Sequence, residues 1–255
     1  MNHGQSDYTP IKQNHLRGIL KIGTKGWNPQ YKPWAHDTAL VIDCTSGNGH
    51  AETGEDGSPV IINNHFANVT YPYRQLCCEQ VPTSFVRLQQ AGLNADLHLG
   101  RYQDGIMGWL DAQNVRMDKP ALGFVYCDPN GVKDLLEGYA MFQGLNLDKR
   151  YSRLDFVFHW SLTAYQRSFG ANITWANDEL SDIIRQILTL KQYAIIREPA
   201  DKHRWVIMYL FNTDKVDGVW RSQGFLPADE WTDKYLLAKG QRPLFDEQVL
   251  AEMSA

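Results

Sequence analysis

The chain has 255 residues, of which 43% are hydrophobic, and its 8 Trp, 12 Tyr and 10 Phe supply enough apolar surface for a large core. The formal net charge is -4, so no overall electrostatic attraction to nucleic acid or to an anionic membrane is expected. Residues 1–15 lack the apolar core of a signal peptide, and no stretch approaches the roughly 18 apolar residues of a membrane span. A cytoplasmic protein with no membrane partner is therefore expected.

Residues 1–35 are polar and are expected to form an irregular, basic and aromatic N-terminal arm. Cations alternate with aromatic side chains there: Arg17, Lys21, Lys25 and Lys32 lie among Trp27, Tyr31 and Trp34. Such a mixture can stack on bases and neutralise phosphates, and it can equally pack on the domain with its charges in water. Both interpretations stay open.

Five short apolar runs follow, and each is separated from the next by a segment with helical spacing of apolar residues. The runs cover residues 39–44, 73–79, 95–100, 122–128 and 153–161. Strand and helix alternating in this way predict parallel βαβ units and a doubly wound α/β sheet. The four cysteines fall in or beside these runs without metal-ligand spacing, so buried thiols are expected rather than a zinc site or disulfides: Cys44, Cys77, Cys78 and Cys127.

After a predicted helix at residues 178–190, the runs 192–199 and 203–213 are separated by three residues and are expected to pair as an antiparallel hairpin at the sheet edge. Five parallel strands followed by such a hairpin resemble the layout of class I methyltransferases, which bind S-adenosylmethionine. We expect one methyltransferase-like domain over residues 36–220, with residues 221–255 as an extension packed on it. The secondary structure of this extension is left unassigned.

In an open α/β sheet the ligand binds beyond the carboxyl ends of the strands. The first run ends at Asp43 and continues into a loop with Gly47 and Gly49, and the second run ends at Glu79, where a carboxylate can accept hydrogen bonds from ribose hydroxyls. A dinucleotide site needs a helix directly after the glycines and an acid about 20 residues later, and neither is present. The helix is expected to start only at Ser58 and Pro59, with Ser58 as the cap, so residues 50–57 form an excursion over the pocket mouth.

The third, fourth and fifth runs supply further candidates. Arg101, Tyr102 and Asp104 follow the third run and are expected to face the adenine, while CDPNG after the fourth run places Asp128 and Asn130 where acceptor and methyl group should meet. His159 could act as a base, and Trp160 could stack on a planar substrate. The expected cofactor-binding residues are Asp43, Thr45, Gly47, Gly49, Glu79, Arg101, Tyr102 and Asp104, and the expected catalytic residues are Asp128, Pro129, Asn130 and Trp160, with no metal.

Together the segments VIDCTSGNG, GEDGSPV, CCE, HLGRYQD, FVYCDPNG and LDFVFHWSLTAYQR resemble the three-Cys-motif partner protein family over roughly residues 38–170. The resemblance implies a class I methyltransferase fold and an S-adenosylmethionine site mapped onto Asp43, Gly47, Gly49, Glu79 and Asp128. Two positions depart from the family: Asn130 replaces an aromatic residue, and Arg101 replaces an acid. DPNG is also similar to, without matching, the Asp-Pro-Pro-aromatic motif of DNA amino-methyltransferases.

The leading hypothesis is therefore an S-adenosylmethionine-dependent methyltransferase that acts on an amino group, with N6 of adenine in DNA as acceptor and low sequence specificity. DNA is favoured over RNA as substrate, and a protein partner or a homo-oligomer is compatible with the sequence. Two alternatives remain: a catalytically silent methyltransferase fold that acts as a partner or binding protein, and a nicotinamide-dependent oxidoreductase. The late helix start and the antiparallel hairpin argue against the oxidoreductase.

Overall fold

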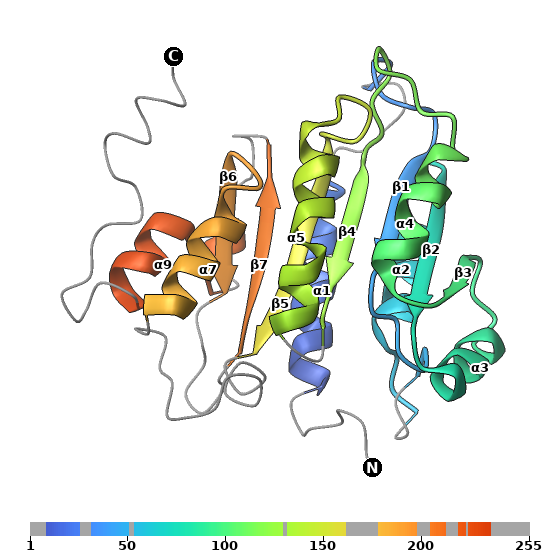
Figure 1. Cartoon of the computed structure of the whole chain (residues 1–255), viewed down its shortest axis with the longest axis horizontal. Helices are drawn as coiled ribbons and strands as arrows, with labels where there is room; N and C mark the ends of the chain where they lie inside the picture. Colours follow the sequence, from blue (N-terminus) through green and yellow to red (C-terminus); the bar gives the residue numbers. More distant parts are fainter. Residues whose placement is uncertain are drawn as a thin grey trace.

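One eight-stranded sheet organises the chain in the computed structural model (Figure 1), which describes residues 9–25, 32–50, 54–129, 132–161, 178–197, 205–212, 219–222 and 224–235. The strand order is β3-β2-β1-β4-β5-β7-β6-β8. The strands are β1 (Ala39–Asp43), β2 (Tyr73–Glu79), β3 (Asp96–Leu99), β4 (Gly123–Cys127), β5 (Leu154–Ser161), β6 (Tyr193–Arg197), β7 (Trp205–Phe211) and β8 (Phe225–Pro227).

The first five strands pair in parallel, and the last three are antiparallel to their neighbours. This confirms the predicted doubly wound sheet with an antiparallel pair of strands. The pair does not form the sheet edge, however, because β7 lies between β5 and β6, and β8 from the unassigned C-terminal extension adds to β6. The sequence prediction missed β8 because it is only three residues long and lies in a segment of mixed polarity.

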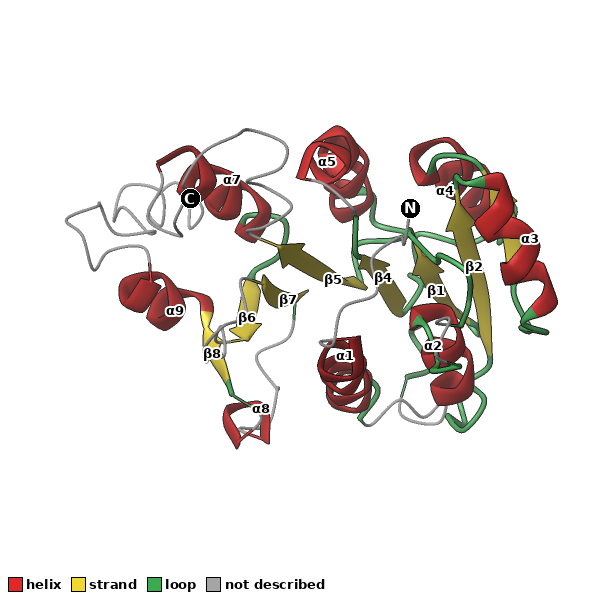
Figure 2. Cartoon of the chain, turned by 90° about the horizontal axis from the view of Figure 1, so that it is seen from below, coloured by secondary structure: helices red, strands yellow, loops and turns green. Residues whose placement is uncertain are grey.

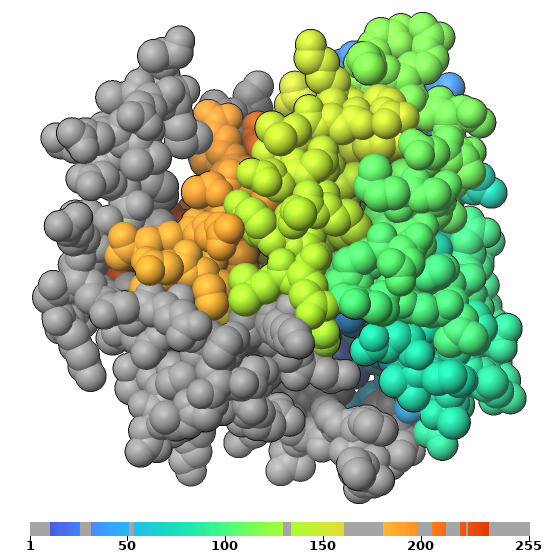
Figure 3. Space-filling model, viewed as in Figure 1, coloured from blue at the N-terminus to red at the C-terminus, as the bar shows by residue number. Residues whose placement is uncertain are grey.

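Helices cover both faces of the sheet (Figure 2). The helices are α1 (Thr9–Gly23), α2 (Ser58–Phe66), α3 (Pro82–Gln90), α4 (Tyr102–Asp111), α5 (Val132–Leu147), α7 (Asp178–Leu188), α8 (Val219–Ser222) and α9 (Ala228–Tyr235). Helices α1 and α2 lie on one face, and α4, α5 and α7 lie on the other. In the space-filling view α4 and α5 form one continuous surface (Figure 3). None of the described helices is long and apolar enough to cross a membrane.

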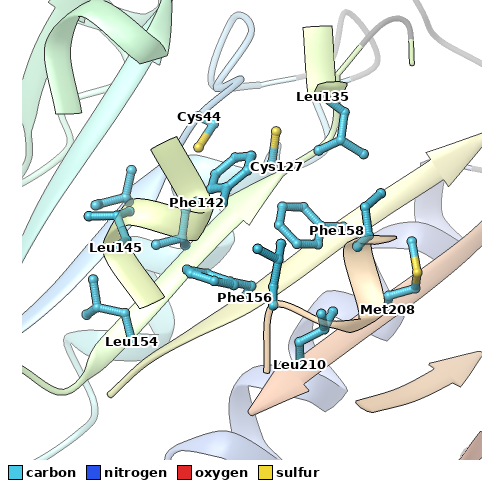
Figure 4. Packing of buried hydrophobic residues seen from close by; sticks show 14 of the residues in the cluster. Cys44, Cys127, Leu135, Phe142, Leu145, Leu154, Phe156, Phe158, Met208 and Leu210 are labelled. Carbon is cyan, nitrogen blue, oxygen red and sulfur yellow. The ribbon is translucent and has the colours of Figure 1, made fainter. Parts of the chain in front are cut away.

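Each face has its own hydrophobic core. On the α5 face, Phe142 packs against Phe156 and Phe158 with ring centroids 5.8 and 5.0 Å away, and the buried thiols of Cys44 and Cys127 border the same cluster (Figure 4). All four cysteines are free and buried, as predicted. Side chains of β1 and β4 alternate between this core and the core on the other face of the sheet. Both strands are therefore buried on both faces, as expected for parallel strands between two layers of helices.

Helix α1 corrects the prediction that the N-terminal residues are irregular. Leu16, Ile19 and Leu20 have helical spacing, are at most 2% exposed, and pack with Ile61 and Phe66 of α2 in the second core. The surrounding Lys, Arg, Asn and Gln residues concealed this narrow apolar stripe in the sequence. The arm therefore contains a docked helix, and the site described below uses two of its side chains.

We expect the Ile19→Ala substitution to reduce the free energy of unfolding by about 2–4 kcal/mol, because it leaves a cavity between α1 and the sheet. Ile19 has 0% exposure. Lys21→Ala, on the exposed side of the same helix, should change stability by no more than about 0.5 kcal/mol. Urea unfolding followed by circular dichroism measures both values. Equal effects of the two substitutions would show that α1 does not dock on the sheet.

Candidate active site

The candidate site is built at the carboxyl ends of three neighbouring parallel strands. β1 lies between β2 and β4, and in the register Asp43 faces Cys77 on one side and Tyr126 on the other. The acids that end or follow these strands, Asp43, Glu79 and Asp128, therefore meet at one edge of the sheet. This is the edge at which open α/β sheets bind their ligands.

Asp43 is completely buried and holds the loop after β1 in place. Its Oδ2 accepts a hydrogen bond of 2.7 Å from Ser58 Oγ, and its Oδ1 accepts one of 3.1 Å from the backbone N of Thr45. Burial raises the pKa of Asp43 to about 7; the two hydrogen bonds oppose this rise, and the carboxylates of Asp128 and Glu79 add to it. The predicted cap is wrong, because Gly57 is the N-cap and the Ser58 hydroxyl binds Asp43 instead.

The glycine loop has the backbone conformation that its composition suggests. Gly47 and Gly49 have φ values of 60° and 84°. Residues with a Cβ atom adopt such positive φ values only at a cost in conformational free energy. Gly57 N donates to Gly49 O at 2.7 Å and closes the excursion, in which His50 also bridges to Asp56. Residues 51–53 of the excursion lie outside the described residues. The start of α2 at Ser58, after a long loop, is confirmed.

A cavity of about 270 Å³ opens above this loop. The residues that line it come from the loop after β1, the segment after β2, the start of α4, the end of β4 and helix α1. Among the predicted cofactor residues, the cavity brings together Thr45, Gly47, Gly49, Glu79, Arg101 and Tyr102. Asp43 lies behind the loop and does not line the cavity, and Asp104 is exposed on α4 outside it.

Glu79 presents a carboxylate oxygen to this cavity. Its Oε1 accepts a hydrogen bond of 2.7 Å from the backbone N of Val81, which fixes the side chain. Within the described part of the chain, no donor is bound to Oε2. Glu79 is 9% exposed and lines the cavity, so Oε2 can accept hydrogen bonds from a ligand.

The segment after β3 contributes differently from the prediction. The ring of Tyr102 stacks on Phe142 at 5.9 Å and its hydroxyl donates to Asp134 O at 2.6 Å, so it forms a wall with its polar group already bonded. Arg101 forms an ion pair with Glu137 of α5. No motif in the sequence indicated Gln103, whose Oε1 is buried and whose amide is part of the cavity wall. No described donor binds this oxygen.

Asp128 is held by three groups from distant parts of the chain. Its backbone N donates to Thr45 Oγ1 at 2.9 Å, its Oδ1 lies 2.5 Å from His159 Nδ1, and its Oδ2 lies 3.5 Å from Lys12 Nζ. Burial would raise the pKa of Asp128, but the charges and hydrogen bonds of His159 and Lys12 lower it well below its usual range. Asp128 therefore stays ionised at neutral pH. His159, which the sequence offered as a possible base, has Asp128 as its partner, and this carboxylate follows the adjacent strand β4.

Of the other predicted catalytic residues, Trp160 and Pro129 do not line the cavity. Trp160 is 1% exposed and belongs to the core on the α5 face, so the prediction that it stacks on a substrate is corrected: side chains alternate along β5, and this one points inward. Pro129 does not line the cavity, and Asn130 lies outside the described residues. Among the described residues no group of three His, Cys, Asp or Glu side chains could hold a metal ion.

Helix α1 brings two residues that no motif indicated. Lys12 reaches Asp128, and Gln13 lines the cavity while being only 8% exposed. Gln13 Nε2 is buried and has no acceptor among the described residues. The spacing of Leu16 and Ile19 would have indicated the helix, but only the tertiary structure places its first turns beside Asp128.

The chain was compared with known proteins. No family model matches it, and none of the curated proteins is significantly similar in sequence. Similar solved structures include protein LPL1258 from Legionella pneumophila, with 13% identity, coverage of 81% of this chain and 89% of that one, and a TM-score of 0.47. The N-terminal domain of human METTL16 has 11% identity, coverage of 82% and 71%, and a TM-score of 0.47. An rRNA methylase from Streptococcus thermophilus has 12% identity, coverage of 82% and 100%, and a TM-score of 0.42.

At TM-scores below 0.5 these similarities carry no argument about activity. The fold is assigned from this chain's own sheet, whose parallel strands with helices on both faces form the predicted doubly wound α/β arrangement. The resemblance to the three-Cys-motif partner family stays a hypothesis, because no family model matches.

The buried Asp43 predicts a specific pH dependence of stability. The pKa of Asp43 is about 7 in the folded chain, whereas an aspartate in an unfolded chain titrates near 3.9. Between these values the folded chain binds more protons, so the contribution of Asp43 to stability is greatest at low pH and is lost as the pH rises through about 7.

The Asp43→Asn variant, which does not ionise, should therefore gain stability relative to the natural chain as the pH rises from about 4 to about 7. Urea unfolding of both proteins at several pH values in this range measures the difference. Taking the difference also removes the contribution of Asp155, a second buried carboxyl whose pKa is raised to about 7 by burial. A difference independent of pH would contradict the assignment.

Proposed function

We propose that this chain is an S-adenosylmethionine-dependent methyltransferase that acts on an amino group, with N6 of adenine in DNA as the leading acceptor. The observation that carries the proposal is the cavity at the carboxyl edge of the sheet, where the glycine loop, Glu79 and the ionised Asp128 are adjacent. When bound, S-adenosylmethionine supplies an electrophilic methyl group on a sulfonium. The residues of the chain bind it, orient the acceptor and exclude water.

The polar groups of the cavity fit the chemistry of that donor. It carries ribose hydroxyls, an exocyclic amine and a carboxylate but no phosphate. The free acceptor Oε2 of Glu79 suits hydroxyl donors, the buried Oε1 of Gln103 suits an amine donor, and Nε2 of Gln13 suits an acceptor such as a carboxylate. A loop without a helix N-terminus behind the glycines is acceptable for a ligand that has no phosphate.

Asp128 is the proposed orienting residue for the acceptor. A carboxylate oxygen that accepts from an amino group fixes the direction of its lone pair, and such alignment contributes much of the rate in a displacement of this kind. His159 is buried and fixes Oδ1, so Oδ2 is the atom at which the acceptor amine would bind. Asn130, the second acceptor expected from the sequence, stays a candidate outside the described residues.

One observation favours a second candidate function, a catalytically silent binding protein. Both oxygens of Asp128 already contact groups of the chain itself, His159 and Lys12, and an acceptor must displace Lys12. A surface ion pair is worth only about 0.2–1 kcal/mol, and this pair is partly exposed, so a substrate amine can replace Lys12 at a modest cost. Lys12 and Asp128 are each about 30% exposed, which keeps this exchange accessible.

Glu79 should dominate ligand affinity. We expect Glu79→Ala to weaken the binding of S-adenosylhomocysteine about 10- to 100-fold, the loss expected for hydrogen bonds to a charged acceptor. Asp104→Ala is the matched control, because Asp104 was predicted from the same pattern but lies outside the cavity. The affinity of this variant for S-adenosylhomocysteine should stay within about twofold of that of the natural chain. Isothermal calorimetry measures both. If neither variant differs from the natural chain, the cavity is not the binding site.

Methyl transfer itself is tested with radiolabelled S-adenosylmethionine and DNA, RNA or protein as acceptor. We expect N6-methyladenine in DNA, with a rate that falls steeply as salt rises because the contacts are mainly to phosphates. Asp128→Ala should lower the rate about 100-fold or more, since an acceptor without its orienting carboxylate loses alignment. Label in RNA alone would change the assigned acceptor, and cofactor binding without transfer to any of the three would favour the silent binding protein.

A further inference from the structure

The amino group of Lys12 lies at the position that the proposed function assigns to the acceptor. Oδ1 of Asp128 is bound by His159, whose side chain is 2% exposed, at 2.5 Å. Lys12 Nζ lies 3.5 Å from Oδ2, and the hydroxyl of Tyr126 also interacts with this carboxylate. The carboxylate oxygen that the proposed function assigns to the acceptor therefore already contacts an amine of the chain.

The position of Lys12 is set by the packing of α1. Leu16, Ile19 and Leu20 are buried against the sheet and α2, and Thr24 Oγ1 lies 2.9 Å from His65 Nε2 at the far end of the helix. At Gly23 the helix is so close to β4 that a Cβ would lie 2.2 Å from the ring of Phe124. The helix is therefore fixed at its middle and at its C-terminal end, and its first turns extend to the cavity, where Gln13 forms part of the wall.

We propose that Lys12 is a methylation site of the chain itself, with its own active site as the methyltransferase. This inference rests on the proposed function. The Nζ lone pair forms the new N–C bond, the S–C bond of the sulfonium breaks, and its electron pair stays on sulfur. The proton that the ammonium must first lose passes to solvent, which reaches this 30% exposed side chain. The products are methyl-lysine, S-adenosylhomocysteine and one proton.

The same helix provides internal controls. Lys21 lies nine residues further along α1, roughly 13 Å away along the helix axis at 1.5 Å per residue. Lys25 follows the C-terminal end of the helix at Gly23 and is further still. Both side chains are exposed and chemically identical to Lys12, but they lie toward the C-terminal end of the helix, away from its first turns at the cavity. A reaction caused by high donor concentration alone would mark all three lysines.

The first experiment incubates the purified chain with S-adenosylmethionine that carries a deuterated methyl group and maps the label by peptide mass spectrometry. The expected result is label on Lys12 and none on Lys21 or Lys25, with a rate constant that does not change on dilution of the protein, because the transfer is intramolecular. The label should disappear in Lys12→Arg and persist in Lys21→Arg. Equal labelling of the three lysines, or no label on Lys12, would overturn the proposal.

A second measurement needs no methyl donor. In competitive acetylation with trace acetic anhydride, an amine held against a carboxylate should react about two- to fivefold more slowly than the free lysines, which corresponds to an exposed ion pair of about 0.4–1 kcal/mol. Asp128→Asn should remove this difference at Lys12 and leave Lys21 and Lys25 unchanged. If Lys12 of the natural chain reacts as fast as the other two, the contact on which the proposal depends is absent and the proposal fails.

Calorimetry on the same preparation separates failure of this inference from failure of the proposed function. If S-adenosylhomocysteine does not bind, the proposed function is wrong and self-methylation fails with it. If it binds and label is transferred to nucleic acid while Lys12 stays unmodified, the methyltransferase assignment stands and the Lys12 inference alone is overturned.

Discussion

The hydrogen bond between Ser58 and Asp43 is the constraint on which the cavity depends. A buried carboxyl is costly unless donors satisfy it, and Asp43 obtains its donors from Thr45 just after β1 and from Ser58 in the first turn of α2. These two bonds fix both ends of the loop that contains Gly47 and Gly49. The loop then presents its backbone and small residues to the cavity, and Thr45 Oγ1 accepts from the backbone N of Asp128. One buried acid thereby connects the first strand, the glycine loop and the fourth strand.

Helix α1 is the second element that the site needs. Its apolar stripe belongs to the same core as α2, so the packing that stabilises this face of the sheet also delivers Lys12 and Gln13 to the carboxyl edge. The tertiary structure, and not a local motif, decides which side chains meet at this edge of the sheet. Here it brings residue 12 to residue 128.

The sequence was sufficient for the parts of this fold that follow from periodicity. The five parallel strands, the late start of α2 and the antiparallel pair of β6 and β7 follow from apolar runs and from Ser58–Pro59, since burial on both faces imposes continuous apolar strands. Tertiary pairings were not predictable in this way. Nothing local indicates that Ser58 binds Asp43 rather than capping α2. Nor does the local sequence show that His159 contacts Asp128 after the adjacent strand, or that Trp160 is buried in the core.

Two of the three acids at this edge of the sheet are stabilised in different ways. Asp43 ends β1, and Asp128 follows the neighbouring strand β4. Their pKa values move in opposite directions: burial raises that of Asp43 to about 7, whereas His159 and Lys12 lower that of Asp128 despite its burial. Neighbouring titratable groups whose pKa values are pushed apart mark different roles for the two groups. Asp43 can hold a proton and serve the loop, while Asp128 remains an anion beside the cavity. Its paired cation is Lys12, whose amino group lies 3.5 Å from Oδ2.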